Sequence, residues 1–406
     1  MPATAGSLYL LSTMVIYYTT DRMRVASWYA ELTCDPIARI IIAMSQLQQA
    51  QYPARYWQLE EDGRICCELC PRFCKLKDGQ RGMCFVRQRQ GDHMVLTTYG
   101  RSSGFCIDPI EKKPLNHFLP GSPVFSFGTA GCNLACKFCQ NWDISKSREW
   151  DTLCDQASPE AIAAVAQRMN CRSVAFTYND PVVFCEYAID VAEACHALGI
   201  QTVAVSAGYM CEAPRLDLYA HMDAANIDLK GFTEDFYQKV TGSHIEPVLE
   251  TIFYIHQETE VWLELTTLLI PGLNDSSAEI EAMTEWVVDN IGPDVPMHFT
   301  AFHPDWKMRD LPPTSPDSLT RAREIALKNG VHYAYTGNVH DLEGGSTYCA
   351  ECGRKVIDRD WYVIRDYSLT DRGVCRFCGA QCAGVFDGPC GDWGARRQPI
   401  KMAGSD

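Results

Sequence analysis

The cysteines of this chain are numerous and unevenly placed, and they constrain its fold more than any other residue type. The 406 residues include 21 cysteines, gathered mainly into three groups at residues 66–84, 132–139 and 349–390. Disulfides persist mainly in oxidising compartments, and the sequence has no secretory leader pattern. We therefore expect a cytoplasmic protein whose grouped cysteines are metal ligands.

The charge balance narrows the range of partners. The chain has 36 Lys and Arg against 51 Asp and Glu, a formal net charge of −15. This excess of acid counts against a broad nucleic-acid or anionic-membrane surface. The longest apolar run near the N-terminus, Ser7 to Tyr18, is shorter than the ~20 residues that span a bilayer. We expect neither a membrane nor a nucleic-acid partner.

From Val124 onward the sequence alternates strand-like and helical segments. We expect strands at residues 124–127, 173–177, 202–206, 225–228, 261–270 and 297–302. We expect helices at residues 159–169, 182–198, 214–221, 276–290 and 317–329, the first of them capped by Ser158. Repeated β/α units predict an α/β fold on a parallel sheet, whose chemistry gathers at the C-terminal ends of the strands.

Three cysteines follow the first of these strands directly. Cys132, Cys136 and Cys139 have the spacing Cys-x3-Cys-x2-Cys on what should be a loop at a strand's C-terminal end. Thiolates at this spacing can hold an iron–sulfur cluster with one open iron. They can also hold a structural zinc that a distant ligand completes, and spacing alone does not separate these two readings.

With Phe138 before its last cysteine, this motif resembles the hallmark of the radical SAM superfamily. Further likeness lies in Asp108–Leu115, Phe299–Pro304 and Tyr335–Val339, and it is closest to the AmmeMemoRadiSam branch, relatives of pyruvate formate-lyase activases. The resemblance implies a partial (β/α)6 barrel. It also implies a [4Fe-4S] cluster on the three cysteines that binds S-adenosylmethionine and yields a 5′-deoxyadenosyl radical, with an electron donor such as flavodoxin or ferredoxin.

The same resemblance implies which residues hold the cofactor. These cofactor-binding candidates are Phe138, Asn179, Asp180, Ser206, Asp228, Lys230 and His303. Two positions depart from the branch's usual pattern, since Asp180 stands where a glutamate is usual and Ala207 where an asparagine is usual. The shorter Asp180 side chain puts its direct contact with the cofactor in doubt.

The flanking cysteine groups also have metal-site spacings. Cys349-x2-Cys352-x22-Cys375-x2-Cys378 predicts a zinc ribbon, with Cys382 and Cys390 as spare thiols. Cys67-x2-Cys70-x3-Cys74-x9-Cys84 offers four more ligands, with Cys66 as an extra candidate, and fits either zinc or a second cluster.

These observations divide the chain into four parts. We expect an N-terminal extension over residues 1–55 that is partly disordered, a Cys-rich block over 56–115, the barrel over 116–340 and a zinc-ribbon-like tail over 341–406. Met44 is an alternative start. The function we expect is radical chemistry on an unidentified small molecule or protein. The alternatives are an activase of a glycyl radical enzyme and, in a different class, a non-catalytic zinc-ribbon scaffold.

Overall fold

The computed structural model describes residues 52–146 and 155–402. The chain divides into two compact units between Gln51 and Tyr52. The first unit, and with it almost all of the expected extension, lies outside the described residues. None of the helices that the structure describes is both long enough and apolar enough to span a membrane.

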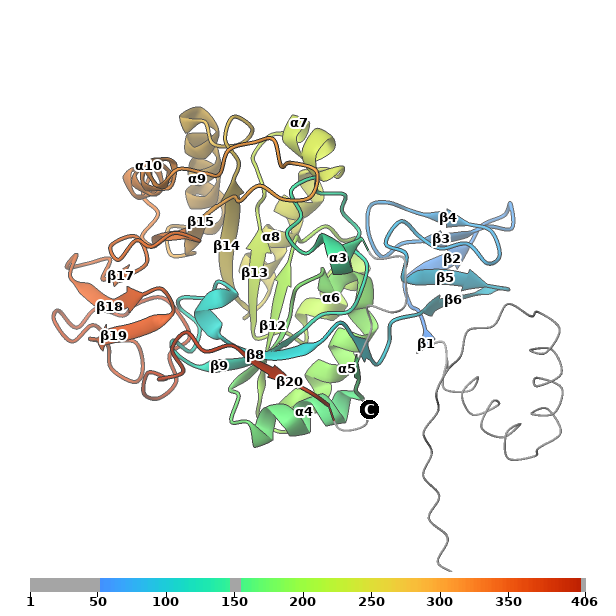
Figure 1. Ribbon diagram of the computed structural model, residues 1–406, viewed down its shortest axis with the longest axis horizontal. Coiled ribbons are helices and arrows are strands. Elements are labelled where there is room, and N and C mark those ends of the chain that lie inside the picture. The colour runs from blue at the N-terminus through green and yellow to red at the C-terminus, as the bar shows by residue number, and fades with distance from the viewer. Residues whose placement is uncertain (1–51, 147–154, 403–406) are drawn as a thin grey trace, which may run out of the picture. The chain divides into compact units, whose positions relative to one another are not determined.

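A nine-stranded sheet forms the centre of the described residues (Figure 1). In spatial order its strands are β16 (Ala334–Gly337), β15 (Met297–Ala301), β14 (Trp262–Leu269), β13 (Ala224–Asp228), β12 (Gln201–Ser206), β11 (Ser173–Phe176), β9 (Pro123–Phe127), β8 (Phe105–Pro109) and β20 (Gln398–Ile400). The strands from β9 to β16 pair in parallel, whereas β8 and β20 are antiparallel additions at one edge. The predicted α/β fold with a parallel sheet is confirmed.

Helices connect the parallel strands. They are α4 (Pro159–Arg168), η3 (Pro181–Phe184), α5 (Cys185–His196), α6 (Glu212–Tyr219), α8 (Glu246–Glu258), α9 (Ser277–Ile291) and α10 (Pro316–Lys328). The predicted cap at Ser158 is confirmed, because its side chain accepts the N–H of Ala161, and Ser276 and Ser315 cap α9 and α10 in the same way. Helix α8 and strand β16 were not predicted.

The Cys-rich block before the sheet consists of short antiparallel strands. Strands β2 (Trp57–Leu59), β3 (Ile65–Cys67) and β4 (Lys75–Leu76) form one sheet, and β1 (Tyr52–Pro53), β6 (His93–Leu96) and β5 (Arg87–Gln90) form another. Strand β7 (Arg101–Ser102) pairs with β10 (Asp155–Gln156). Arg87 fixes the block to α5 through a fully buried ion pair with Glu186, with Nη1 2.9 Å from Oε2.

The tail after β16 forms a second small sheet and then returns to the central one. Strands β17 (Thr347–Tyr348), β18 (Lys355–Asp360) and β19 (Val363–Tyr367) are antiparallel. Strand β20, the red strand in Figure 1, then pairs with β8. The central sheet therefore draws strands from both segments that flank the predicted 116–340 barrel.

Candidate active site

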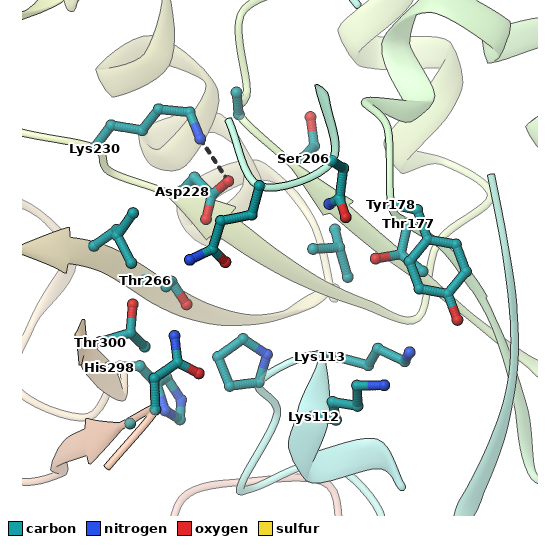
Figure 2. A pocket seen from close by; sticks show the side chains of 18 of the residues that line it. Lys112, Lys113, Thr177, Tyr178, Ser206, Asp228, Lys230, Thr266, His298 and Thr300 are labelled. Carbon is teal, nitrogen blue, oxygen red and sulfur yellow. Dashed lines mark hydrogen bonds and ion pairs between the residues drawn. The ribbon is translucent and has the colours of Figure 1, made fainter. Parts of the chain in front are cut away.

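A cavity of about 400 Å³ opens at the C-terminal ends of the parallel strands. Its walls include polar side chains from consecutive strands, which Figure 2 shows pointing into one space: Ser206, Asp228, Thr266, His298 and Thr300. A cavity at this end of a parallel α/β sheet is the usual place for ligand binding. Cys132, Cys136 and Cys139 line the same cavity.

The three cysteines lie on the loop between β9 and the short helix α3 (Trp142–Ser145). Gly131 starts this loop with φ of +80°, and a Cβ there would lie 2.2 Å from the carbonyl oxygen of Cys84. Farther along, the N–H of Ala135 donates to Thr241 O at 2.8 Å and that of Lys137 to Val240 O at 3.0 Å. Both acceptors belong to the π-helical turn η4 (Tyr237–Thr241), which follows α7 (Glu234–Phe236). Elements distant in the sequence therefore set the loop's shape.

Asn179 supports the same loop from the end of β11. Its Oδ1 accepts the N–H of Thr129 at 2.8 Å, and its Nδ2 donates to Gly131 O at 2.9 Å and to Ala130 O at 3.2 Å. The side chain lines the cavity, but these bonds use both ends of its amide. Asn179, predicted as a cofactor ligand, therefore hydrogen-bonds the cysteine loop in this structure.

Asp180 and Ser206 contact each other at the cavity wall. Asp180 Oδ1 accepts from Ser206 Oγ at 2.9 Å and from Val182 N at 3.1 Å, and its Oδ2 accepts from Ala207 N at 3.0 Å. Burial raises the pKa of Asp180 despite these hydrogen bonds. The shorter carboxylate therefore ties the end of β11 to the end of β12.

Asp228 and Lys230 form an ion pair at the end of β13. Lys230 Nζ lies 2.7 Å from Asp228 Oδ2 and 5.8 Å from the centre of the Phe138 ring. Burial acts to lower the pKa of Lys230, but the charge of Asp228 and the nearness of Cys136 raise it above its usual value. A fixed cation therefore stands beside the cysteine loop, and both members of the pair line the cavity.

His303 is not brought into the cavity with the other candidates. It is exposed, and its Nδ1 lies 3.2 Å from the carbonyl oxygen of Pro304. The histidine that lines the cavity is His298, on β15, whose Nε2 lies 2.6 Å from Glu264 Oε2. Alternation along β15 could have found it, because His298 and Thr300 are the polar residues on one face of an apolar strand.

Other cavity residues were missed because they lie outside the barrel strands. Lys112 and Lys113 belong to the 3-10 turn η1 (Ile110–Lys112) and its end, and Arg359, Trp361 and Tyr362 belong to the tail hairpin. The paired lysines of the Asp108–Leu115 motif were a signal in the sequence, whereas nothing in the tail sequence marks its position over the cavity.

The tail cysteines converge as the spacing predicted. Within the part of the chain that the structure describes, Cys349, Cys352, Cys375 and Cys378 are the one group of three or more His, Cys, Asp or Glu residues positioned to hold a metal ion, with ligand atoms within 4.8 Å of one another. Each pair sits in a tight turn closed by a glycine N–H, from Gly353 to Cys349 O and from Gly379 to Cys375 O, both at 2.9 Å.

The cysteines of the N-terminal block lie around a smaller cavity. Cys67, Cys70, Cys74 and Cys84 line it together with the buried Arg87, while Cys66 is not part of the lining. Asn133, the neighbour of Cys132, closes the same cavity, and Arg72 Nε donates to Asn133 O at 2.9 Å. This block therefore packs directly against the central cysteine loop.

Comparisons with known proteins agree with this architecture. Residues 127–287 match the family model described as the Radical SAM superfamily. The chain is 37% identical over 327 residues to the uncharacterized protein MJ0808 of Methanocaldococcus jannaschii, covering 80% of this chain and 97% of the relative.

Solved structures with a similar arrangement include two proteins at low identity. A domain of pyruvate-formate lyase-activating enzyme from Bacteroides vulgatus is 17% identical, with 41% of this chain and 99% of that one covered and a TM-score of 0.37. A radical SAM methyltransferase from Sphaerobacter thermophilus is 16% identical, with 54% and 67% covered and a TM-score of 0.42.

The chain belongs to the radical SAM superfamily, and it is a radical SAM enzyme. The family implies an iron–sulfur cluster and S-adenosylmethionine as cofactors, and radical SAM enzymes generally need an electron donor and a substrate. The residues present fit such a pair of cofactors. Three thiols from one loop line a cavity that also holds a fixed cation, a fixed carboxylate and several hydroxyls.

Proposed function

We propose that Cys132, Cys136 and Cys139 hold a [4Fe-4S] cluster and that the enzyme cleaves S-adenosylmethionine reductively. When bound, the cluster and its cofactor supply a 5′-deoxyadenosyl radical that acts on a small molecule or a protein side chain. The observation that carries the proposal is that the three thiols share one cavity with Asp228, Lys230 and Ser206. Protein groups in such a site bind, orient and shield the cofactor.

The chain's own residues divide these tasks. Lys230, held by Asp228, would bind the carboxylate of S-adenosylmethionine, and Asp180 with Ser206 would face its ammonium group. Phe138 packs beneath Lys230 and keeps water from that side of the loop. Asn179 keeps the loop in shape, and the exposed His303 is left out of this set.

The flanking parts complete the proposal. The tail cysteines Cys349, Cys352, Cys375 and Cys378 would hold a structural zinc. Cys67, Cys70, Cys74 and Cys84 would hold zinc or a second cluster. We assign residues 56–115 to the Cys-rich block, 116–340 to the barrel and 341–406 to the tail. We place the enzyme in the AmmeMemoRadiSam branch and in the cytoplasm. Its proposed electron donor is flavodoxin or ferredoxin.

Anaerobic reconstitution with iron and sulfide tests this proposal. With dithionite and S-adenosylmethionine, the full chain should develop the cluster's absorbance band and form 5′-deoxyadenosine. Cys136→Ala should abolish the product while the tail retains its zinc, measured by elemental mass spectrometry. The matched variant Cys352→Ala should lose the zinc. Absence of both the band and the product from the unaltered chain would refute the proposal.

A further inference from the structure

The cavity has a second end that the proposed cofactor contacts leave unused. Figure 2 shows Lys112 and Lys113 across the cavity from Lys230 and Asp228. The cysteines, Asp180 and Ser206 are assigned to the cofactor in the proposed function. The side chains around the two lysines remain for the substrate.

Two lysines at this end share one carboxylate. Asp108, fully buried on β8, lies 2.9 Å from Lys112 Nζ through Oδ1 and 2.7 Å from Lys113 Nζ through Oδ2. Its Oδ2 also accepts the Tyr178 hydroxyl at 2.8 Å. Lys113 is 2% exposed, whereas Lys112 is 34% exposed. Two ammonium groups therefore face a single negative charge, and the more accessible of them borders the cavity.

The surrounding charges do not cancel this excess. Asp228 is paired with Lys230 and Glu264 with His298, and Glu111 lies 3.8 Å from Arg359. Arg397, beside the Cys106 thiol, adds positive charge near Asp108.

Like Asp180, the cavity-lining carboxylate Asp341 is held by protein donors rather than by a cation. It accepts the Thr336 hydroxyl at 2.8 Å and the N–H of Gly344 at 2.9 Å. These donors stabilise its charge locally, so it does not act as a partner for Lys112 or Lys113.

One buried donor at this end also lacks a hydrogen-bond partner. Within the described residues, Arg359 Nε makes no hydrogen bond, although Arg359 lines the cavity and is only 1% exposed. Its ion-pair partner, Glu111 Oε1, lies 3.8 Å away, beyond hydrogen-bond distance. Buried donors are almost always hydrogen-bonded, so Arg359 Nε is available to an acceptor such as an anionic oxygen.

The tail hairpin covers this end. Arg359 donates to Thr347 Oγ1 and to Asn116 O, both at 2.7 Å, and so fixes β18 to the segment that follows Lys113. The turn it supports carries Trp361 and Tyr362, and Trp361 has φ of +54° and is 48% exposed. Strained backbone conformations cluster at functional sites, and this one lies in a turn that lines the cavity.

We propose that this end of the cavity is the substrate subsite and that the substrate carries an anionic oxygen group, a carboxylate or a phosphate, which binds Lys112 and Lys113 beneath the Trp361 turn. The inference rests on the proposed function, because the other end of the cavity must belong to the cofactor. Lys112 supplies a charge-assisted hydrogen bond without leaving Asp108 unpaired, since Lys113 and Tyr178 continue to satisfy that carboxylate.

Equilibrium dialysis on the reconstituted full chain, with S-adenosylmethionine at saturation, tests this inference. The probes are radiolabelled pyrophosphate and glutarate, with neutral glutaramide as the uncharged control. We expect saturable binding of one of the two anions, weakened about tenfold in Lys112→Gln and retained in Lys112→Arg. The preferred anion identifies phosphate or carboxylate as the group recognised.

The matched control is Lys239→Gln. Lys239 also forms an i,i+4 ion pair, with Asp235 at 2.6 Å, but lies outside the cavity lining, so its loss should leave anion binding unchanged. Binding of neither anion, equal binding of glutaramide, or equal affinity in Lys112→Gln would overturn the inference. These outcomes differ from failure of the proposed function, which is absence of both the cluster's absorbance band and 5′-deoxyadenosine and does not depend on anion binding.

Discussion

The tail knuckles and the central cysteine loop both place cysteines a few residues apart, yet they reach their geometry by different means. In the tail, each pair is closed by its own next glycine, and the N–H groups of Cys349 and Cys375 bond to Arg354 and Ala380 five residues on. In the central loop, the partners are Asn179, Val240 and Thr241, far away in the sequence. A metal ion can organise the first site locally, whereas the second depends on the assembled barrel.

A Gly→Ala substitution in each region should give the largest difference in the free energy of unfolding. Gly131 and Gly353 both have positive φ, so Gly→Ala costs about 1 kcal/mol of backbone strain at either position. A Cβ at residue 131 would also strike the Cys84 carbonyl at 2.2 Å, whereas at residue 353 nothing lies within 4 Å. Gly131→Ala should lower the free energy of unfolding by about 3–4 kcal/mol and Gly353→Ala by about 1 kcal/mol, measured by urea denaturation. Equal losses of unfolding free energy would show that the central loop is no more tightly constrained than the tail knuckles.

Acid should reveal how the tail is joined to the barrel that supports the central loop. His117, in the segment after η1, is linked to Ala383 O in the tail through Nδ1 at 2.6 Å and to Tyr335 through Nε2. Burial lowers the pKa of His117 from 6.5 to about 4. Between these values the unfolded chain binds the extra proton, so the free energy of unfolding falls as the pH falls from 6.5 to 4, by about 3 kcal/mol in total.

The comparison variant for this prediction is His117→Gln. Carboxylates also titrate in acid, so the informative quantity is the difference between the two proteins' stability profiles from pH 6.5 to pH 5. That difference should narrow as the pH falls, because the variant has no imidazole to protonate. Parallel profiles would show that His117 does not titrate in this range.

The smallest effect we predict comes from removing the contacts that Asn179 makes to the central loop. Asn179→Ala removes the bonds to Thr129, Ala130 and Gly131 and should cost about 2 kcal/mol, because it leaves buried backbone groups unpaired. Iron incorporation on reconstitution should fall while the tail metal is retained. Asn290→Ala is the control, since Asn290 is exposed and its side chain, within the described residues, hydrogen-bonds to Trp286 O in the same helix. Unchanged iron content in Asn179→Ala would contradict the positioning role.

The strands and helices of the barrel were predictable because their signals are local. Strands β9, β11, β12 and β13 lie within a residue of their expected limits, since parallel strands buried on both faces are short apolar runs. Strand β20 could not be predicted, because Gln398–Ile400 has no apolar alternation and depends on pairing with β8. Helix α8 was missed although it is 13 residues long.

Some residues of the candidate site could also be predicted from the sequence, and others could not. Spacing predicted the cysteine groups, and the resemblance to a known family supplied Asp228 and Lys230, which the structure joins in an ion pair. The position of Asn179 beneath the loop could not be predicted, because its partners, apart from the Thr129 hydroxyl, are backbone atoms that no side-chain pattern marks. His303 came from the same resemblance, whereas the structure places His298, which alternation along β15 marks, in the cavity.

The pairing of β20 with β8 has a consequence for how the protein is made. Strand β8 emerges from the ribosome early, but its outer edge is covered only when residues 398–400 arrive. Until then, β8 presents unpaired backbone groups to any other nascent chain, the condition under which strands join the wrong partner. Recombinant versions cut before Gln398 should therefore aggregate during expression.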